Sequence, residues 1–336
     1  VVGRDASSGS NKINLDGDYT VTLTGTAAAA DVITIYGNTS GHITGTGITA
    51  FTGTAANIAT IAGREADSGS NKINLDTDFT ATVDAGSVAA ADLNTISAKT
   101  GGTVTATNAT AITGTASAVA AMVGDSEISV DGDYTVTITG TAAAADIITI
   151  YGDTSGHITA SGVTTVTGTA ANIATIIGRD ADTGNNKINL DGNYTVTLSG
   201  TAAAADVITI YGNTSGHITA SAVTAFSGTA ANVATLVGRD ADSGSNKINM
   251  DGDYTVTLTG TAAAGDIITI YGNTSGHITA TGVTALTGTA ANIATVVGRD
   301  ADSGSNKINL DTDYTATVDA GSVAAADLNT ISGNTG

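Results

Sequence analysis

The sequence predicts an α/β solenoid, in which parallel strands alternate with short, alanine-rich helices in coils of about 30 residues. Three observations lead to this prediction. A segment of about 60 residues recurs six times, and each copy consists of two related halves. Each half combines an alternating strand pattern with an alanine-rich stretch of helical length. A repeat of this kind forms one supersecondary unit, which buries its apolar face against its neighbours.

The six copies are recognised by an acidic turn followed by an aromatic residue. The turns begin, in steps of 60, 55, 60, 60 and 60 residues, at Asp16, Asp76, Asp131, Asp191, Asp251 and Asp311. Copies two and six share the variant "TATVDAGSVAAADLNTIS" and lack a histidine segment that the others have. We treat residues 1–336 as a single tandem-repeat solenoid. Because the chain begins and ends inside a repeat, we expect it to be a fragment of a longer array.

Each coil begins with a predicted strand. In the first copy Tyr19, Val21 and Leu23 alternate with threonines, a period of two that is typical of a half-buried strand. In the fifth copy "KINMDGDYTVTL" continues this alternation across Gly252. The pattern favours one long strand that is kinked at this glycine, and a hairpin at the Asp-Gly pair is the alternative.

The strands lead into predicted helices. Residues 54–63 have Thr54 as an N-cap and Gly63 as the residue that ends the helix. Residues 26–37 follow the same pattern, with Thr26 as the cap. Helices this short are not stable alone and need a sheet to pack on. The alternative is an all-β solenoid with strands in the alanine-rich stretches, although alanine is depleted in strands.

The composition excludes several classes of function. The net charge is −20, from 31 acidic and 11 basic residues, so the chain repels nucleic acid and anionic membrane surfaces. No apolar run approaches the roughly 18 residues of a membrane-spanning helix. The chain has no cysteine, which excludes disulfides, thiol nucleophiles and thiolate metal sites. We therefore expect neither a nucleic-acid partner nor membrane insertion.

The acidic turns are the candidate metal site. Calcium takes about six to eight oxygen ligands, which clustered carboxylates and turn carbonyls can supply. The candidate ligands for Ca²⁺ are Asp16, Asp18, Asp76, Asp78, Asp131, Asp133, Asp191, Asp251, Asp253, Asp311 and Asp313. The calcium nonapeptide and the EF-hand loop are absent from the sequence. Plain turn formation by Asp-Gly is the alternative interpretation.

The histidines do not indicate an enzyme. All four lie in the repeated text "TSGHIT", at His42, His157, His217 and His277. Coils stacked directly on one another would place equivalent residues of successive copies roughly 9–10 Å apart, too far to share one zinc ion. No Ser-His-Asp set or carboxylate pair stands out when every copy is equal. We therefore expect surface or turn histidines and a protein without catalytic activity.

Two further residue types recur in register. Thr20, Thr22 and Thr24 fall on one face of the first strand. Stacked over many coils, such threonines would form a flat array, which is either an ice-binding surface or ordinary strand composition. Arginine recurs in "GRD" or "GRE" and lysine in "NK", among acidic neighbours, which predicts ion pairs between coils.

The repeated text "TGTAAAAD" and "TSGHITATGVTALTGTAANIATVVG" resembles the giant tandem-repeat surface and extracellular proteins of bacteria, of the β-strand-repeat type and especially from cyanobacteria. The resemblance covers the whole chain. It implies a location outside the cell or on its surface, with an adhesive, sheath or motility-associated role, and calcium binding in some members.

These observations lead to one functional expectation and one alternative. We expect a structural extracellular repeat protein, a non-catalytic building block of a bacterial surface layer or filament. Its partner would be the protein itself, assembled end to end or laterally. The alternative is a ligand-binding solenoid, either an ice-binding protein or a glycan-binding adhesin.

Overall fold

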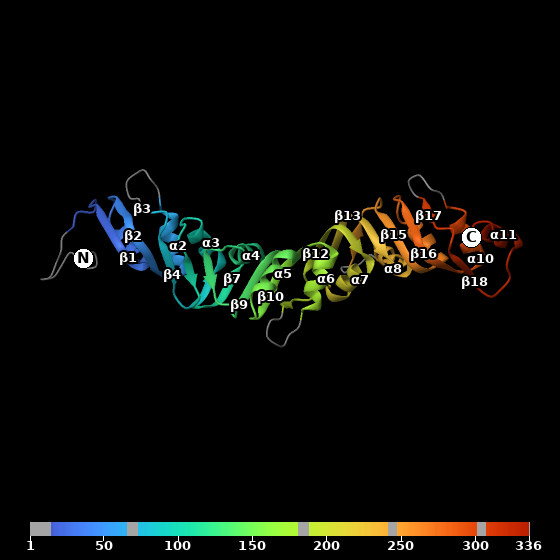
Figure 1. Ribbon diagram of the computed structural model, residues 1–336, viewed down its shortest axis with the longest axis horizontal. Helices are drawn as coiled ribbons and strands as arrows, with labels where there is room; N and C mark the ends of the chain where they lie inside the picture. The colour runs from blue at the N-terminus through green and yellow to red at the C-terminus, as the bar shows by residue number, and fades with distance from the viewer. Residues whose placement is uncertain (1–14, 66–72, 181–187, 241–246, 301–306, 336) are drawn as a thin grey trace. The chain divides into compact units, whose positions relative to one another are not determined.

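The computed structural model describes residues 15–65, 73–180, 188–240, 247–300 and 307–335. Within these ranges, strands alternate with short helices in repeated units of about 30 residues (Figure 1). The sequence-based prediction of an α/β repeat is therefore confirmed. The all-β alternative is wrong, because the alanine-rich stretches form helices.

Strands and helices follow one another along the described chain with nearly constant lengths. The helices are α1 (Ala29–Asn38), α2 (Ala55–Gly63), α3 (Ala90–Ser97), α4 (Ala116–Val123), α5 (Ala144–Asp153), α6 (Ala170–Gly178), α7 (Ala204–Asn213), α8 (Ala230–Asp240), α9 (Ala264–Tyr271), α10 (Ala290–Val297) and α11 (Ala325–Ser332). The strands are β1 (Val21–Ala28), β2 (Ile43–Gly53), β3 (Ile73–Leu75), β4 (Thr80–Val83), β5 (Gly86–Ala89), β6 (Val104–Ala106), β7 (Ala109–Gly114), β8 (Ile128–Val130), β9 (Thr135–Ala143), β10 (Ile158–Gly168), β11 (Ile188–Leu190), β12 (Thr195–Ala203), β13 (Ile218–Gly228), β14 (Ile248–Met250), β15 (Thr255–Ala263), β16 (Ile278–Gly288), β17 (Ile308–Leu310) and β18 (Thr315–Val318).

The chain divides into two compact units. The first comprises the residues up to Ala142 with Asp146–Gly162 and Ala181–Asn189, and the second comprises the remainder. In the first unit the strand order is β1-β2-β4-β6-β8, with β3 beside β2. In the second unit β12, β13, β15 and β16 are neighbours in a parallel sheet, with β14 beside β13 and with β17 and β18 beside β16.

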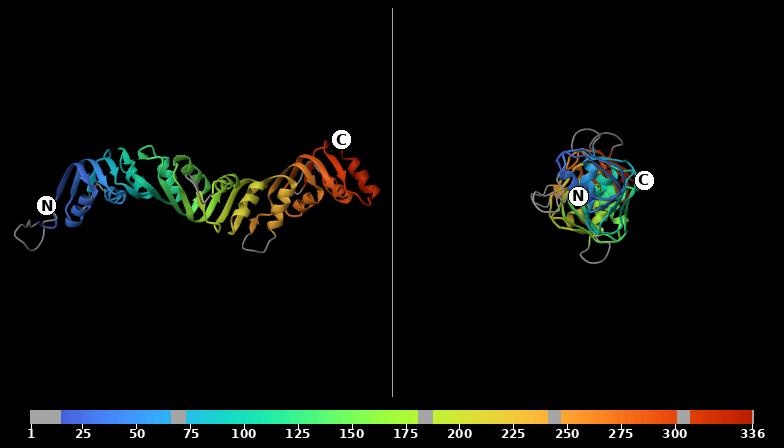
Figure 2. Two further views of the ribbon diagram at one scale, coloured as in Figure 1. Left: turned by 90° about the horizontal axis from the view of Figure 1, so that it is seen from below. Right: turned by 90° about the vertical axis from the view of Figure 1, so that its left-hand side faces the viewer.

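In each unit the helices pack against the strands, whose ribbons Figure 2 shows from two directions, and the apolar core lies between them. On β15, Val256 and Leu258 are buried and the threonines between them are exposed, as the period of two predicts. Ile293 and Val296 of α10 are also fully buried. Each such side chain contributes about 1.5–3 kcal/mol when it is removed from water. Most of the core therefore consists of aliphatic side chains, together with a few buried aromatic rings such as Phe226 and Tyr254.

The start of α2 is predicted correctly, and the start of α1 is predicted incorrectly. Thr54 is the N-cap of α2, where its hydroxyl accepts a hydrogen bond from the backbone N–H of Asn57. Thr26, the predicted cap of the first helix, lies in β1 opposite Ala50. Gly25 has φ of +76°, and a bulge there lets the strand continue for three more residues before α1 begins.

The end of α2 lies at the glycine that the sequence predicts. Gly63 is the last residue of α2, and it is not among the glycines with positive φ in the described chain. Arg64 follows it as the C-cap, and its backbone N–H donates to the last turn of the helix. Gly63 thus ends the helix, as the sequence predicts, without adopting a left-handed conformation.

The segment "KINMDGDYTVTL" forms one interrupted strand. Its two parts, β14 and β15, both run parallel to β13. Ile248 lies opposite Ile218, and Thr255 lies opposite Ala225, so both pairs are separated by 30 residues. The acidic turn lies between the two parts. The hairpin alternative is wrong, because a hairpin would pair antiparallel. The two parts run in the same direction as the single-strand prediction requires, but a turn at residues 251–254 divides that strand in two.

Neighbouring strands are staggered, so equivalent residues of successive copies do not stack. Ala202 lies opposite Phe226, which lies opposite Val256, 54 residues further along the chain. The sequence equivalent of Ala202 is Ala262, six residues beyond Val256 on the same strand. Six residues of strand span about 20 Å. The predicted distance of roughly 9–10 Å between equivalent residues of successive copies, which assumed direct stacking, is therefore wrong.

Candidate functional site

The acidic turn of one coil is joined to the segment that precedes the next strand. The hydroxyl of Thr214 donates to the carbonyl oxygen of Tyr194 at 2.5 Å. Ser215 donates to the carbonyl oxygen of Gly192 twice, from its backbone N–H at 2.8 Å and from its hydroxyl at 3.1 Å. We call this arrangement the interlock. The same threonine-to-carbonyl bond joins Thr39 to Tyr19, Thr100 to Phe79, Thr154 to Tyr134 and Thr274 to Tyr254.

The interlock requires a glycine. A Cβ atom on Gly216 would lie 2.1 Å from the carbonyl oxygen of Tyr194, far inside van der Waals contact. The backbone N–H of Gly216 also donates to the hydroxyl of Thr214 at 3.0 Å. The same close approach, at 2.1–2.3 Å, occurs at Gly41, Gly102, Gly156 and Gly276. Only glycine lets the two backbones come this close, which accounts for the recurrence of Gly in "TSG".

The predicted calcium ligands lie on the surface of these turns. All eleven side chains, from Asp16 to Asp313, are exposed. Several accept a hydrogen bond from the next backbone N–H in the turn, as Asp76 does from Thr77 at 2.9 Å. Among the described residues, no three His, Asp or Glu side chains lie close enough together to hold a metal ion. Turn formation is thus the role that the geometry provides, and calcium binding stays a prediction.

In three copies a second aspartate makes a hydrogen bond to the strand that follows it. The carboxylate of Asp180 accepts a hydrogen bond from the backbone N–H of Leu190 at 2.9 Å. Equivalent bonds join Asp240 to Met250 and Asp300 to Leu310, each at 2.9 Å. The sequence analysis did not assign this role. The recurrence of Asp after Gly-Arg is the signal that could have indicated it.

Tyr194, Tyr254 and Tyr314 are buried, each beside the aspartate that precedes its turn. Tyr194 is 2% exposed, and its hydroxyl has no hydrogen-bond partner. Burial, and secondarily the charge of Asp180, raise the pKa of Tyr194 to about 12. In another copy the hydroxyl of Tyr134 donates to Asp153 at 2.5 Å, and burial together with this bond also raises its pKa. These phenols are therefore core residues and stay protonated at neutral pH.

The repeated arginines lie over tyrosine rings. The guanidinium carbon of Arg239 lies 4.5 Å from the ring centroid of Tyr211, and the Arg239 side chain donates to the Tyr211 hydroxyl at 2.9 Å. The corresponding distances are 4.3 Å for Arg64 over Tyr36 and 4.0 Å for Arg299 over Tyr271. The sequence predicted ion pairs for these arginines, and the cation–π contacts were not predicted. The signal that could have indicated them is that Arg and Tyr recur together in the repeat.

The backbone carbonyl group of each of the four histidines accepts a hydrogen bond from the neighbouring strand, just before the two strands pair. The carbonyl oxygen of His277 accepts a hydrogen bond from the backbone N–H of Val256 at 2.9 Å. His42, His157 and His217 make the same bond to Val21, Val136 and Val196. Their side chains are half-buried. This position fits the interpretation of the histidines as turn residues.

The sheet face opposite the helices carries the threonines. Thr255, Thr257 and Thr259 of β15 are exposed, as the alternation predicts. Thr257 lies opposite Thr279, whereas Thr259 lies opposite Gly282. The stagger therefore makes this face a mixture of hydroxyl-bearing and small residues, and the predicted ladders of stacked threonines are interrupted.

No protein-family model, curated protein or solved structure matches the chain. In the part of the chain that the structure describes, no helix is both long enough and apolar enough to span a membrane.

Proposed function

We propose that the protein is a non-catalytic structural component outside the bacterial cell, a repeat-built block of a surface layer or filament. The observation that carries this proposal is the interlock. The repeated residues Thr214 and Ser215 join one coil to the next by hydrogen bonds, and Gly216 allows the close approach that these bonds need. According to this proposal, the hydrogen-bonding residues of the repeat hold neighbouring coils together.

The energetics of the interlock favour a scaffold. Each of its hydrogen bonds contributes about 0.5–1.5 kcal/mol net, and Thr214 is only 4% exposed, so its bond is protected from water. In repeat proteins, stability is approximately the sum of the repeats and of the contacts between nearest neighbours. A joint that recurs with every copy therefore stabilises an array of any length, as a surface layer or filament needs.

The negative surface charge affects how copies of the protein would associate. The net charge of −20 makes bare copies repel one another, and the acidic turns are exposed. Divalent cations reduce such repulsion. We therefore include calcium as a candidate ligand at the exposed turns, which would promote contacts between copies of the protein.

Electron microscopy of the purified protein tests the proposal. We expect filaments or sheets in the presence of calcium, and the same sample is imaged after chelation. Assemblies that persist after chelation support the scaffold without a role for calcium, and assemblies that dissolve assign the ion to the acidic turns. Separate particles under both conditions at every concentration would contradict self-assembly.

The exposed threonine face supports a second candidate function, binding of ice or glycans. Its hydroxyl groups recur along a strand every second residue, about 6.6–6.8 Å apart, and neighbouring strands are about 4.7–4.9 Å apart. Thermal hysteresis and glycan-array binding test this candidate. Thr257→Lys and Thr259→Lys alter only exposed positions of β15 and should abolish either activity without unfolding the protein.

A further inference from the structure

Within the described chain, four odd-numbered helices are each joined to the next even-numbered helix by a pair of side chains. The odd-numbered helix contributes its eighth residue, and the other coil contributes the tenth residue counted from the start of its helix. We call these two places the pairing positions. The pairs are Tyr36–Arg64, Ser97–Asp125, Tyr211–Arg239 and Tyr271–Arg299.

Three of the four pairs are cation–π contacts. In each of them the guanidinium carbon lies 4.0–4.5 Å from the centroid of the tyrosine ring. Arg239 also donates a hydrogen bond to the Tyr211 hydroxyl at 2.9 Å. The faces of an aromatic ring are negative and attract a cation. A long cationic side chain therefore fits opposite tyrosine at the pairing positions.

The fourth pair uses different chemistry at the same two positions. The hydroxyl of Ser97, which is 6% exposed, donates to Oδ2 of Asp125 at 2.6 Å. The other carboxylate oxygen, Oδ1, accepts a hydrogen bond from the backbone N–H of Glu127 at 2.9 Å. Asp125 thus holds its own turn with one oxygen atom and the neighbouring helix with the other. Arginine has no acceptor atom and could make neither bond.

The length of the segment after the even-numbered helix changes together with the pair. Three residues separate Gly124 from Ile128, where β8 begins, and the first of them is Asp125. Nine residues separate Gly63 from Ile73, where β3 begins, and the first of them is arginine. The same nine-residue spacing follows the glycines at the ends of the other arginine-bearing coils. The short turn needs an acceptor at its first residue, and the long segment does not.

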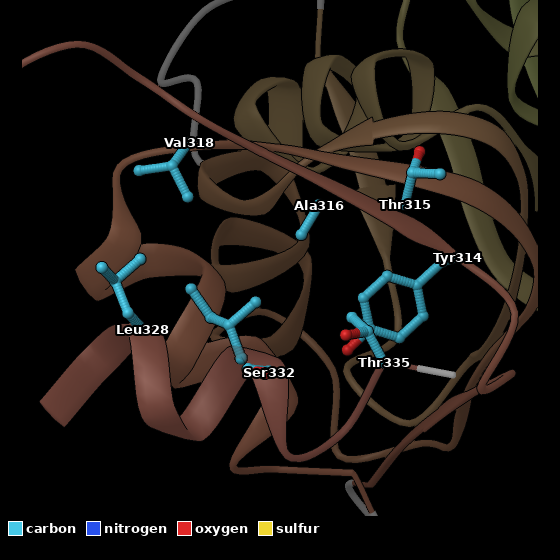
Figure 3. Close-up of a pocket in the computed structure, with 8 residues that line it drawn as sticks. Tyr314, Thr315, Ala316, Val318, Leu328, Ser332 and Thr335 are labelled. Carbon is cyan, nitrogen blue, oxygen red and sulfur yellow. The ribbon is translucent and has the colours of Figure 1, made fainter. Parts of the chain in front are cut away.

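The two types of pair do not mix along the sequence. The eighth residue is tyrosine in α1, α5, α7 and α9 and serine in α3 and α11. Figure 3 shows the serine of α11, Ser332, among the residues that line a pocket on this coil. In the five successions from α1 and α2 to α9 and α10, tyrosine is always followed by arginine, and serine is followed by aspartate.

A mixed pair would be unfavourable in either direction. Tyrosine in place of Ser97 would bring the negative face of its ring towards two carboxylates, those of Asp125 and of Glu127, whose Oε2 lies 3.3 Å from the Ser97 hydroxyl oxygen. Serine in place of Tyr211 would remove the ring on which Arg239 lies, and a hydroxyl group offers no face for stacking.

We propose that the pairing positions determine which even-numbered coil can follow a given odd-numbered coil. Tyrosine selects a coil that carries arginine and a long following segment, and serine selects a coil that carries aspartate and a short turn. The last turn of the odd-numbered helix is thus a recognition surface, and its partner is the next coil of the same chain. This inference does not rest on the proposed function, because it concerns how coils fit together within one chain.

The test is a double-mutant cycle at Tyr211 and Arg239. These side chains are half-buried and exposed, respectively, so their replacement should not prevent folding. Tyr211→Ser and Arg239→Asp are made singly and together in the full chain, and amide hydrogen exchange of α7 and α8 is measured. We expect Tyr211→Ser alone to speed exchange by about threefold, because the cation–π contact is lost. In the Arg239→Asp background the same change should slow exchange, because a matched pair replaces a mixed one.

The matched control replaces a tyrosine that belongs to another pair. Tyr36→Ser should leave exchange of α7 and α8 unchanged, with or without Arg239→Asp, because Tyr36 lies beside Arg64. Acceleration of equal size by Tyr211→Ser in both backgrounds would overturn the proposal, since the two residues would then act independently. A milder cycle, Ser97→Ala with Asp125→Asn, tests the other pair through exchange of α3 and α4. Independent effects there would overturn the proposal as well.

Discussion

The substitution Gly216→Ala removes the close approach on which the interlock depends. The added methyl carbon would lie 2.1 Å from the carbonyl oxygen of Tyr194 and 2.6 Å from its carbonyl carbon. These are backbone atoms of the neighbouring coil, so no flexible side chain can move aside. The two backbones must separate, which breaks the bonds that Thr214 and Ser215 make across the joint.

The size of the effect follows from these contacts. Overpacking of a well-fitted interior costs about 1–3 kcal/mol. Two or three lost hydrogen bonds add about 1 kcal/mol each. We therefore expect Gly216→Ala to lower the free energy of unfolding by about 3–6 kcal/mol.

The assay combines urea denaturation, followed by circular dichroism, with amide hydrogen exchange of β12 and β13. Exchange is needed because a repeat array can open locally, and a single midpoint then averages over coils. The control is Gly212→Ala in α7 of the same coil, where no atom lies within 4 Å of the added carbon. Alanine is the better helix former, so this variant should be more stable by about 0.5–1 kcal/mol. Equal stability of the two variants would refute the reasoning.

Three further predictions follow from the same geometry. Thr289→Ala removes the N-cap of α10 and should lower stability by about 1 kcal/mol in urea denaturation, whereas an unchanged midpoint would contradict the cap. Burial and Asp180 raise the pKa of Tyr194 from 10.0 to about 12. The unfolded chain therefore loses the phenol proton at a lower pH than the folded chain, so the free energy of unfolding is unaffected below about pH 10 and falls as the pH rises towards 12. Tyr194→Phe should reduce this decline, as measured by urea midpoints at about pH 9 and about pH 11, and an equal decline in both proteins would disprove it. Arg239→Ala removes the stacking on Tyr211 and should cost about 0.5–1 kcal/mol, whereas Arg239→Lys should retain part of it.

The sequence predicted those features of the fold that are encoded locally. The alternation of Val256 and Leu258 with threonines fixes a strand and its buried face. Thr54 marks the start of α2 because capping depends on a single side chain and the next few backbone groups. The start of α1 was missed because the bulge at Gly25 and the pairing of Thr26 with Ala50 decide it. Those are contacts with another strand, which local patterns do not contain.

The candidate site was predicted only in part for the same reason. The acidic turns can be recognised in the amino-acid sequence, and their exposure to solvent follows from their polar side chains. Their partners lie about 20 residues away, as Thr214 lies from Tyr194, and only the folded coil brings them together. The recurrence of Gly216 and its equivalents was a usable signal, because a glycine repeated outside a turn indicates close backbone approach.

The stagger of the strands bears on the choice between the two proposed functions. A surface that binds a periodic lattice such as ice needs like groups at regular positions along and across the strands. Across the strands, Thr257 lies opposite Thr279, but Thr259 lies opposite Gly282 and Thr261 opposite Ala285, so small residues interrupt the rows of hydroxyl groups. A scaffold makes no such demand, since the threonine bond of the interlock recurs in five copies whatever lies on the open face. The stagger thus weakens the case for ice binding and leaves the case for a structural repeat intact.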